Sequence, residues 1–344
     1  MAEPRGSRVR RVAALTLAAL LATLVTGCSG SGGASSLVTV TPAAPATAPP
    51  TQTTPAGTVR PLSADVRGTV LDPRTRTLVL LVGAPERLLL LDADNFAATP
   101  RTVALPSVAA QVTLAGAGGS VLLATDGAVL RVDTRSGAVS RIPVSGDVTA
   151  VLQLRDGAVV AGLRNGTTDV LGPDGAVRAT VPGLARVDEL VQAGDALLAL
   201  DRAQSALAVL KPDQGRLGLE LRAGNGATNA VADSYGRVLV TNTRDGELLA
   251  FSGDPLILRQ RYPVAGSPYA LAFDARTNIV WVTLSATNQL LGYDVRGGEP
   301  TLRYTFATVA QPYSVAVDEQ TGAVLVSSAA GAGVQRIVPT EVAK

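Results

Sequence analysis

The sequence predicts an all-β fold, a seven-bladed β-propeller, for the part of the chain that follows residue 57. Short apolar runs alternate with turns rich in Gly, Asp and Asn from Thr58 onward, and the same apolar–turn–apolar unit returns every 38 to 45 residues. Intervals of this length with four strands each are typical of a propeller. Apolar residues do not recur at helical spacing in this part of the chain, which excludes a helical solenoid.

The N-terminus has the pattern of an export signal. Four arginines between residues 5 and 11 precede the uncharged apolar run 12–26, which is too short for a comfortable membrane span. The end of the run and the two residues after it form Leu24-Val25-Thr26-Gly27-Cys28, which resembles a bacterial lipobox. Residues 1–27 are therefore predicted to be a lipoprotein signal peptide. The general secretory route is favoured, with twin-arginine export as the alternative because of Arg10-Arg11.

Cys28 is the only cysteine of the chain, so an exported protein has no second thiol for a disulfide. We expect Cys28 to carry the lipid that holds the protein in the bilayer, on the extracytoplasmic face of the cell membrane. Residues 28–57 combine this cysteine with a stretch rich in Thr, Pro and Ala that contains no charged residue. Such a composition predicts a disordered linker.

The domain from residue 58 to residue 344 contains seven repeats. Each repeat is aligned on the first core residue of its second strand: Leu78, Val121, Val159, Leu197, Val238, Ile279 and Val324. The last repeat has only three strands before the chain ends. We expect Thr58 to Ala64 to supply the fourth strand and so to close the ring, because pairing the two ends removes exposed sheet edges.

The turns between strands often begin with aspartate, as at Asp72, Asp274 and Asp318. A short carboxylate that caps its own turn explains these residues better than a metal site does. The run Ala115-Gly116-Ala117-Gly118-Gly119 superficially resembles a phosphate-binding loop, but no helical pattern follows it. We predict a glycine-rich hairpin turn there.

The segment Val238 to Leu248, VLVTNTRDGEL, resembles the repeat of the YVTN-family β-propellers, and Ile279 to Leu284 is a weaker copy. The resemblance covers the last three repeats well and the first four loosely. Together with the lipobox and an Ala-rich, Lys-poor composition, it resembles an actinobacterial surface lipoprotein. The resemblance implies a binding scaffold without a defined activity.

The loops before the inner strands of a propeller form the mouth of its central channel. Alignment of the repeats at this point predicts a ring of ligand-binding positions: Arg67, Gln111, Thr149, Asp188, Thr228, Tyr269 and Tyr313. The two tyrosines lie in neighbouring repeats and could stack on a flat or sugar-like ligand. The alternative is that both fill the channel or pack on neighbouring blades.

Charge and composition exclude several activities. The chain contains no histidine, and 26 basic against 27 acidic residues follow Cys28. The first fact disfavours general acid–base and transition-metal chemistry, and the second disfavours nucleic acid as a partner.

The sequence therefore predicts a membrane-anchored module that binds or scaffolds a protein, a peptide or a cell-envelope glycan, without catalysis, cofactor or metal. The alternative is a metal-dependent hydrolase or lactonase that uses Asp188, Glu189 and Asn229 at the channel. Three candidate oxygen ligands are few for a calcium site.

Overall fold

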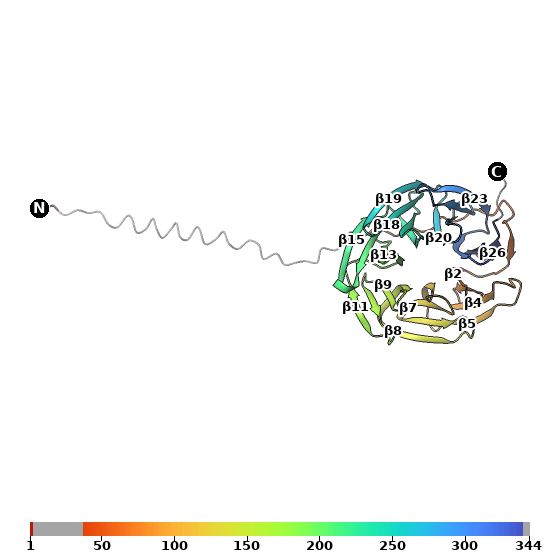
Figure 1. The fold of residues 1–344 in the computed structure, drawn as a ribbon, viewed down its shortest axis with the longest axis horizontal. Coiled ribbons are helices and arrows are strands. Elements are labelled where there is room, and N and C mark those ends of the chain that lie inside the picture. Colours follow the sequence, from red (N-terminus) through yellow and green to blue (C-terminus); the bar gives the residue numbers. More distant parts are fainter. Residues whose placement is uncertain (3–36, 340–344) are drawn as a thin grey trace. The chain divides into compact units, whose positions relative to one another are not determined.

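The computed structural model describes residues 1–2 and 37–339, and residues 39–339 form a ring of six antiparallel sheets (Figure 1). The first sheet contains β2 (Val66–Asp72), β3 (Thr77–Val82), β4 (Arg87–Asp92) and β5 (Arg101–Ala104). The second contains β6 (Ala109–Leu114), β7 (Ser120–Asp133), β8 (Val139–Gln153), β9 (Val159–Leu163), β10 (Thr168–Leu171) and β11 (Val177–Val181). The third contains β12 (Glu189–Ala193), β13 (Ala196–Asp201), β14 (Ala206–Lys211) and β15 (Arg216–Arg222), with the 3-10 turn η1 (Pro212–Gln214) before β15.

The remaining three sheets complete the ring. One contains β16 (Ala227–Ala232), β17 (Arg237–Asn242), β18 (Glu247–Gly253) and β19 (Leu256–Pro263). The next contains β20 (Pro268–Asp274), β21 (Ile279–Leu284), β22 (Gln289–Asp294) and β23 (Thr301–Ala307). The closing sheet contains β24 (Pro312–Asp318), β25 (Ala323–Ser328), β26 (Val334–Ile337) and β1 (Thr58–Arg60).

The prediction of seven separate blades was wrong, because the propeller has six sheets. The second and third predicted repeats share one six-stranded sheet, β6 to β11. Two long strands join them: β7 has 14 residues and β8 has 15, and both bend at register shifts, near Asp126 and near Thr149. A bulge lets a strand change direction without ending, so a strand continues where the sequence pattern indicates a turn.

Neighbouring sheets pack face to face through their apolar side chains. Every residue of β3, β21 and β25 is buried, because the second strand of each sheet is covered on both faces. The outermost strands, such as β15 and β19, are largely exposed. Six of the seven apolar clusters of the described residues span two adjacent sheets, and the seventh lies within the six-stranded sheet. One of the six joins β2–β5 to Leu325 and Val334 of the closing sheet. The ring is therefore held together by the contacts between sheets.

The two ends of the domain meet in the closing sheet, as predicted. β1 pairs with β26 in antiparallel register, with Thr58 opposite Arg336 and Arg60 opposite Val334. The predicted closing strand is thus confirmed for its first three residues. The pairing covers the edge of β26 that the last repeat leaves open.

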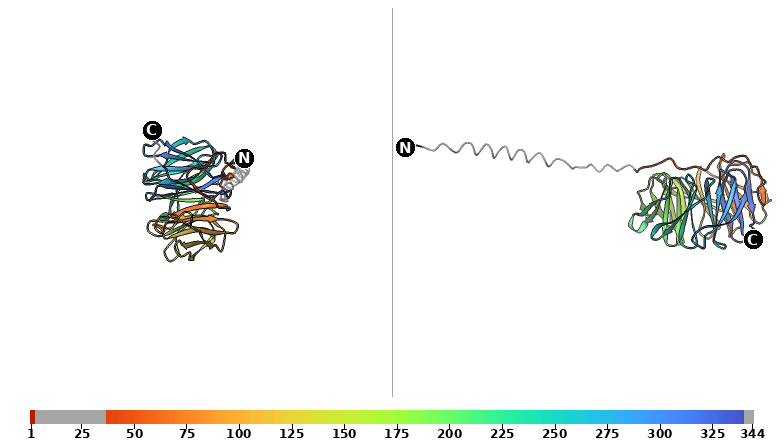
Figure 2. Two further views of the ribbon diagram at one scale, coloured as in Figure 1. Left: turned by 90° about the vertical axis from the view of Figure 1, so that its right-hand side faces the viewer. Right: turned by 90° about the horizontal axis from the view of Figure 1, so that it is seen from above.

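Residues 39–56 differ from the predicted linker, because they lie along the propeller as an extended strap (Figure 2). The strap has no helix or strand of its own, yet hydrogen bonds join it to the ring at Ala203, Ser267 and Gln311. Composition indicates that the segment cannot build a core, but it says nothing about partner groups elsewhere in the chain. The signal peptide and Cys28 lie outside the described residues. Among those that are described, no helix meets the length and apolarity needed to span a membrane.

Candidate functional site

The inner strands all begin on one face of the ring, which we call the front face, and end on the opposite back face. The turns between second and third strands also lie on the front face, because the strands are antiparallel. Five predicted ring residues sit in register shifts: Arg67, Thr228, Tyr269 and Tyr313 where inner strands begin, and Thr149 within the long strand β8. A bulge turns a side chain away from the regular alternation. The sequence therefore located a repeated structural feature of the front face.

Gln111 does not belong to this set. The register of β6 skips Ala110, so Ala110 occupies the bulge and Gln111 is the residue after it. Gln111 corresponds to Glu189 and Asn229, which also follow the ring position in their strands. The alignment was wrong by one residue because β6 is surrounded by small apolar residues that leave the phase of the pattern open.

Two of the ring threonines have structural roles. The Thr149 hydroxyl donates to the carbonyl of Val187 at 2.5 Å, which joins two adjacent sheets. The Thr228 hydroxyl is fully buried and lies 2.5 Å from that of Thr243. Neither side chain is available to a ligand.

The two charged ring residues are also paired within the protein. Asp188 is 7% exposed, forms an ion pair with Arg186 and accepts a hydrogen bond from the backbone of Arg202 at 2.9 Å. Arg67 is more exposed and pairs with Asp65 at 2.9 Å. Of the two, only Arg67 is accessible on the front face.

A polar cluster of Gln111, Glu189, Arg202 and Asn229 connects three sheets around the ring axis. Gln111 donates to Glu189 at 2.9 Å, and Arg202 reaches Glu189 at 3.3 Å and Asn229 at 3.4 Å. The side-chain amide oxygen of Gln111 accepts the backbone N–H of Val151 at 2.8 Å. Sequence reasoning missed Arg202; the signal was a charged residue directly after the buried end of β13.

The electrostatics of the polar cluster depend on burial. Burial raises the pKa of Glu189 to about 7, although the positive charge of Arg202 and the hydrogen bond from Gln111 act in the opposite direction. Burial lowers the pKa of Arg202, but Glu189 and other nearby groups outweigh this effect, so the guanidinium stays charged. Both oxygens of Glu189 already have a partner, which leaves little room for a cation.

Tyr269 and Tyr313 pack on each other, with ring centroids 4.8 Å apart and planes tilted by 46°. Tyr269 is only 5% exposed and belongs to the apolar cluster that joins the last two sheets, which Tyr313 also contacts. Burial raises the pKa of Tyr269 above its ordinary value. The alternative that the tyrosines pack between neighbouring sheets therefore describes their contacts.

The strap crosses the front face from the third sheet to the closing sheet. Its backbone is held by polar groups of successive turns: Val40 donates to Ala203, and Arg244 donates to the carbonyl of Thr41. The side chain of Gln311 makes two hydrogen bonds with the strap: it donates to the carbonyl of Ala46 at 2.9 Å and accepts the N–H of Ala48 at 2.8 Å. Asn288 then donates to the carbonyl of Pro49 at 2.8 Å. Part of the face expected to bind a ligand is thus occupied by the chain itself.

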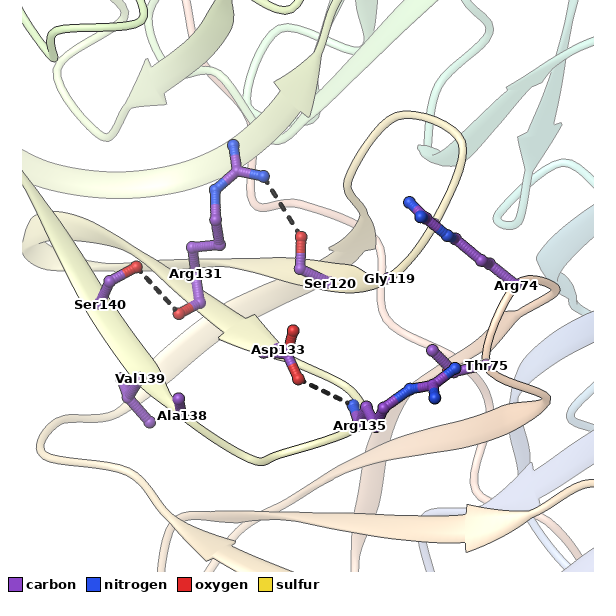
Figure 3. A pocket seen from close by; sticks show the side chains of 11 residues that line it. Arg74, Thr75, Gly119, Ser120, Arg131, Asp133, Arg135, Ala138, Val139 and Ser140 are labelled. Atoms are coloured by element: carbon purple, nitrogen blue, oxygen red, sulfur yellow. Dashed lines mark hydrogen bonds between the residues drawn. The ribbon is translucent and has the colours of Figure 1, made fainter.

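The back face carries a different site, an arginine pocket between the first and second sheets (Figure 3). Its volume is about 530 Å³, and the charged residues that line it are Arg74, Arg131, Arg135 and Asp133. Figure 3 shows Arg74 and Arg131 on either side of the Gly119–Ser120 segment. Sequence reasoning missed this pocket, since its arginines come from separate turns and strands.

The aspartates of the back-face turns act as predicted. Asp274 accepts the backbone N–H groups of Arg276 and Thr277, and Asp318 accepts that of Gln320. The predicted hairpin at residues 115–119 is also present, between β6 and β7. Within residues 37–339, no three Cys, Asp or Glu side chains come together in a group that could hold a metal ion.

Comparison with known proteins shows the fold alone. No protein-family model matches the chain, and no curated protein sequence matches it. Hydrazine synthase from Kuenenia stuttgartiensis is similar with a TM-score of 0.71 at 14% identity, over 83% of this chain and 98% of that one. Virginiamycin B lyase from Staphylococcus aureus reaches 0.68 at 11% identity, over 82% and 99%, and a chain of a mitotic checkpoint complex reaches 0.70 at 13%, over 88% and 99%. The chain is thus a β-propeller, while its resemblance to the YVTN family remains a prediction.

Proposed function

We propose that this protein is a lipid-anchored, extracytoplasmic binding module that presents a rigid propeller to a protein, peptide or glycan of the cell envelope, without catalysis. The observation that carries the proposal is the strap. It ties the N-terminal side of the propeller to the front face and leaves the back face, with its arginine pocket, free for a partner. A fixed attachment on one face and an open site on the other suit a module that displays a binding surface.

The structural neighbours do not favour one activity, because their names include a lyase, a synthase and a checkpoint complex. A catalytically inactive variant of virginiamycin B lyase lacks one histidine, and the present chain contains none. This chain therefore cannot carry out a reaction that depends on a histidine of its own. This supports a binding role over an enzymatic one.

The alternative of a metal-dependent hydrolase is disfavoured by the contacts of its proposed ligands. Asp188 pairs with Arg186, and Glu189 is held by Gln111 and Arg202. A cation at this place would have to displace or approach the guanidinium groups of Arg186 and Arg202, which is electrostatically unfavourable.

Attachment at the front face also bears on orientation. Ten residues, 29–38, separate Cys28 from the first residue of the strap, and even a fully extended chain of this length spans at most about 35 Å. A lipid on Cys28 would keep the propeller close to the bilayer. We propose that the front face is the one turned toward the membrane.

Two measurements in intact cells test the proposal. Cys28→Ala should release the protein from the membrane fraction, whereas retention would contradict the lipid anchor. A photo-crosslinking residue at Ala138, on the rim of the arginine pocket, should capture an envelope component. The same residue at the exposed front-face position Thr287 is the matched control. Equal capture at both positions, or none at Ala138, would contradict a binding surface on the back face.

A further inference from the structure

We propose that the arginine pocket binds a phosphate group carried by a sugar or polyol. This deepens the proposed function and rests on it for the envelope origin of the ligand. The pocket brings together three guanidinium groups and one carboxylate, a net charge of +2, in a chain whose residues after Cys28 are nearly neutral. A local excess of positive charge of this kind attracts anions.

None of the three guanidinium groups is neutralised from within the described chain. Between residues 37 and 339, no carboxylate oxygen lies within 4.0 Å of Arg74, Arg131 or Arg135, whereas ten other arginines form such pairs. The aspartate of the pocket, Asp133, uses one oxygen to cap its own turn. These guanidinium groups therefore keep an uncompensated charge, and arginine binds oxyanions in a bidentate manner.

The backbone that carries two of these arginines is fixed in the same way in both turns. The N–H of Arg74 donates to Asp72 at 2.9 Å, and the N–H of Arg135 donates to Asp133 at 3.0 Å. The arginine stands two residues after the capping aspartate in both cases. Each turn thus has a backbone fixed by its aspartate and carries an arginine side chain that lines the pocket.

A single carboxylate also ties these turns to each other. The second oxygen of Asp72 accepts the Thr134 hydroxyl at 2.5 Å and the N–H of Gly119 at 2.8 Å. Gly119 has a φ of +94°, and at Gly118, with a φ of +99°, a side chain would meet the Asp72 carboxylate. The pocket is therefore a built site that spans the junction of the first two sheets.

The remaining lining favours an organic phosphate over the free ion. Arg131 donates to the Ser120 hydroxyl at 3.2 Å, so the hydroxyl proton remains available to a ligand oxygen. Ala138 and Val139 add an apolar wall, and the pocket volume of about 530 Å³ exceeds what a phosphate ion needs. A sugar or polyol carbon skeleton fits against that wall while its phosphate meets the arginines.

Calorimetric titration of the full chain in detergent with glucose 6-phosphate, inorganic phosphate and uncharged glucose tests the inference. We expect saturable binding of glucose 6-phosphate, weaker binding of phosphate and none of glucose. Arg74→Ala and Arg131→Ala should each weaken glucose 6-phosphate binding at least about tenfold, because each removes a charge-assisted hydrogen bond. Arg131→Lys should bind with intermediate affinity.

Arg259→Ala is the matched control, because Arg259 is an exposed arginine on β19 that also donates to a serine hydroxyl, that of Ser252, and pairs with no carboxylate of residues 37–339. Equal affinity in Arg74→Ala and Arg259→Ala would overturn the inference, as would the absence of saturable binding. Arginine-dependent cosedimentation with phosphatidylserine vesicles that glucose 6-phosphate does not compete would instead assign the site to an anionic bilayer surface and also overturn the inference. A failed titration with successful crosslinking at Ala138 would leave the proposed function standing.

Discussion

Arg76 and Asp318 join the first sheet to the closing sheet through two hydrogen bonds of 2.7 Å each. Their side chains are 17% and 3% exposed, so the pair is far less screened than an ordinary surface ion pair. Burial of Asp318 opposes its ionisation, but hydrogen bonds from Arg76 and Thr321 outweigh this and lower the pKa of Asp318 to about 2. The closure of the ring thus depends on one charged contact as well as on strand pairing.

This contact predicts an acid-dependent loss of stability. Because the pKa of Asp318 is lower in the folded state, its contribution is present above about pH 4 and is lost as the pH falls from about 4 to about 2. Arg76→Met should reduce the free energy of unfolding by roughly 2 kcal/mol at neutral pH and flatten this acid dependence, as measured by urea denaturation. Arg261→Met, which breaks the more exposed pair with Glu247, should reduce the free energy of unfolding clearly less than Arg76→Met does. Equal losses in the two variants would contradict this assignment.

Glu189 predicts a pH dependence of the opposite sign. Its folded-state pKa is raised to about 7. Its contribution to the free energy of unfolding is therefore complete below about pH 4.5 and is lost as the pH rises through about 7. Glu189→Gln keeps the shape of the side chain and its hydrogen bond with Gln111. In the unmodified protein, the free energy of unfolding should decline by on the order of 1–3 kcal/mol as the pH rises, and Glu189→Gln should remove this decline. Unfolding free energies between pH 4 and pH 8 measure it, with Glu299→Gln in an exposed turn as the control. An unfolding free energy that still declines between pH 4 and pH 8 in Glu189→Gln would contradict this interpretation.

At the scale of elements, β1 stabilises the whole ring although it has only three residues. Val59→Pro with Arg60→Pro removes two consecutive N–H donors, one of which must face β26 whichever way the strand alternates. We expect the free energy of unfolding to fall by on the order of 1 kcal/mol or more, because a ladder hydrogen bond is lost, and the midpoint of thermal melting followed by circular dichroism to fall with it. Gln52→Pro, at an exposed strap position, should melt like the unmodified protein. Identical melting temperatures of the two variants would show that the pairing of β1 with β26 does not stabilise the ring.

The strap predicts a local change without global unfolding. Gln311 has a φ of +52°, a conformation that asparagine tolerates, so Gln311→Asn shortens the side chain without added backbone strain. Combined with Arg244→Ala, it should release the strap and speed proteolysis within residues 39–56 about tenfold, as followed by mass spectrometry. Gln320→Asn, a matched change on the back face, should leave cleavage unchanged. Unchanged cleavage in the double variant would mean that other contacts hold the strap.

For the whole molecule, the arrangement of charge predicts indifference to divalent cations. Asp188 and Glu189 face arginines, and the described residues contain no group of three acidic side chains that could hold a metal ion. Millimolar calcium, manganese or zinc should give no heat in calorimetry and no rise in melting temperature. Tight binding that Asp188→Ala abolishes would restore the metal-dependent hydrolase as the better function.

The sequence by itself determined the all-β class, the spacing of the repeats and the closing strand, because strand alternation and turn residues are local properties. It also located the front-face ring to within one residue, since Arg67, Thr149, Thr228, Tyr269 and Tyr313 mark a recurrent bulge. Turn capping by aspartate was predictable for the same reason.

Only the tertiary structure decided the rest. Whether β7 and β8 bend or end depends on which strands pair with them. The six-stranded sheet could therefore not be predicted from the local sequence pattern. The strap depends on Asn288 and Gln311, which lie more than 200 residues away from it in sequence. The arginine pocket likewise forms only when the ring brings Arg74 beside Arg131 and Arg135. Long-range pairing, which composition and periodicity do not encode, therefore decides where this protein can bind.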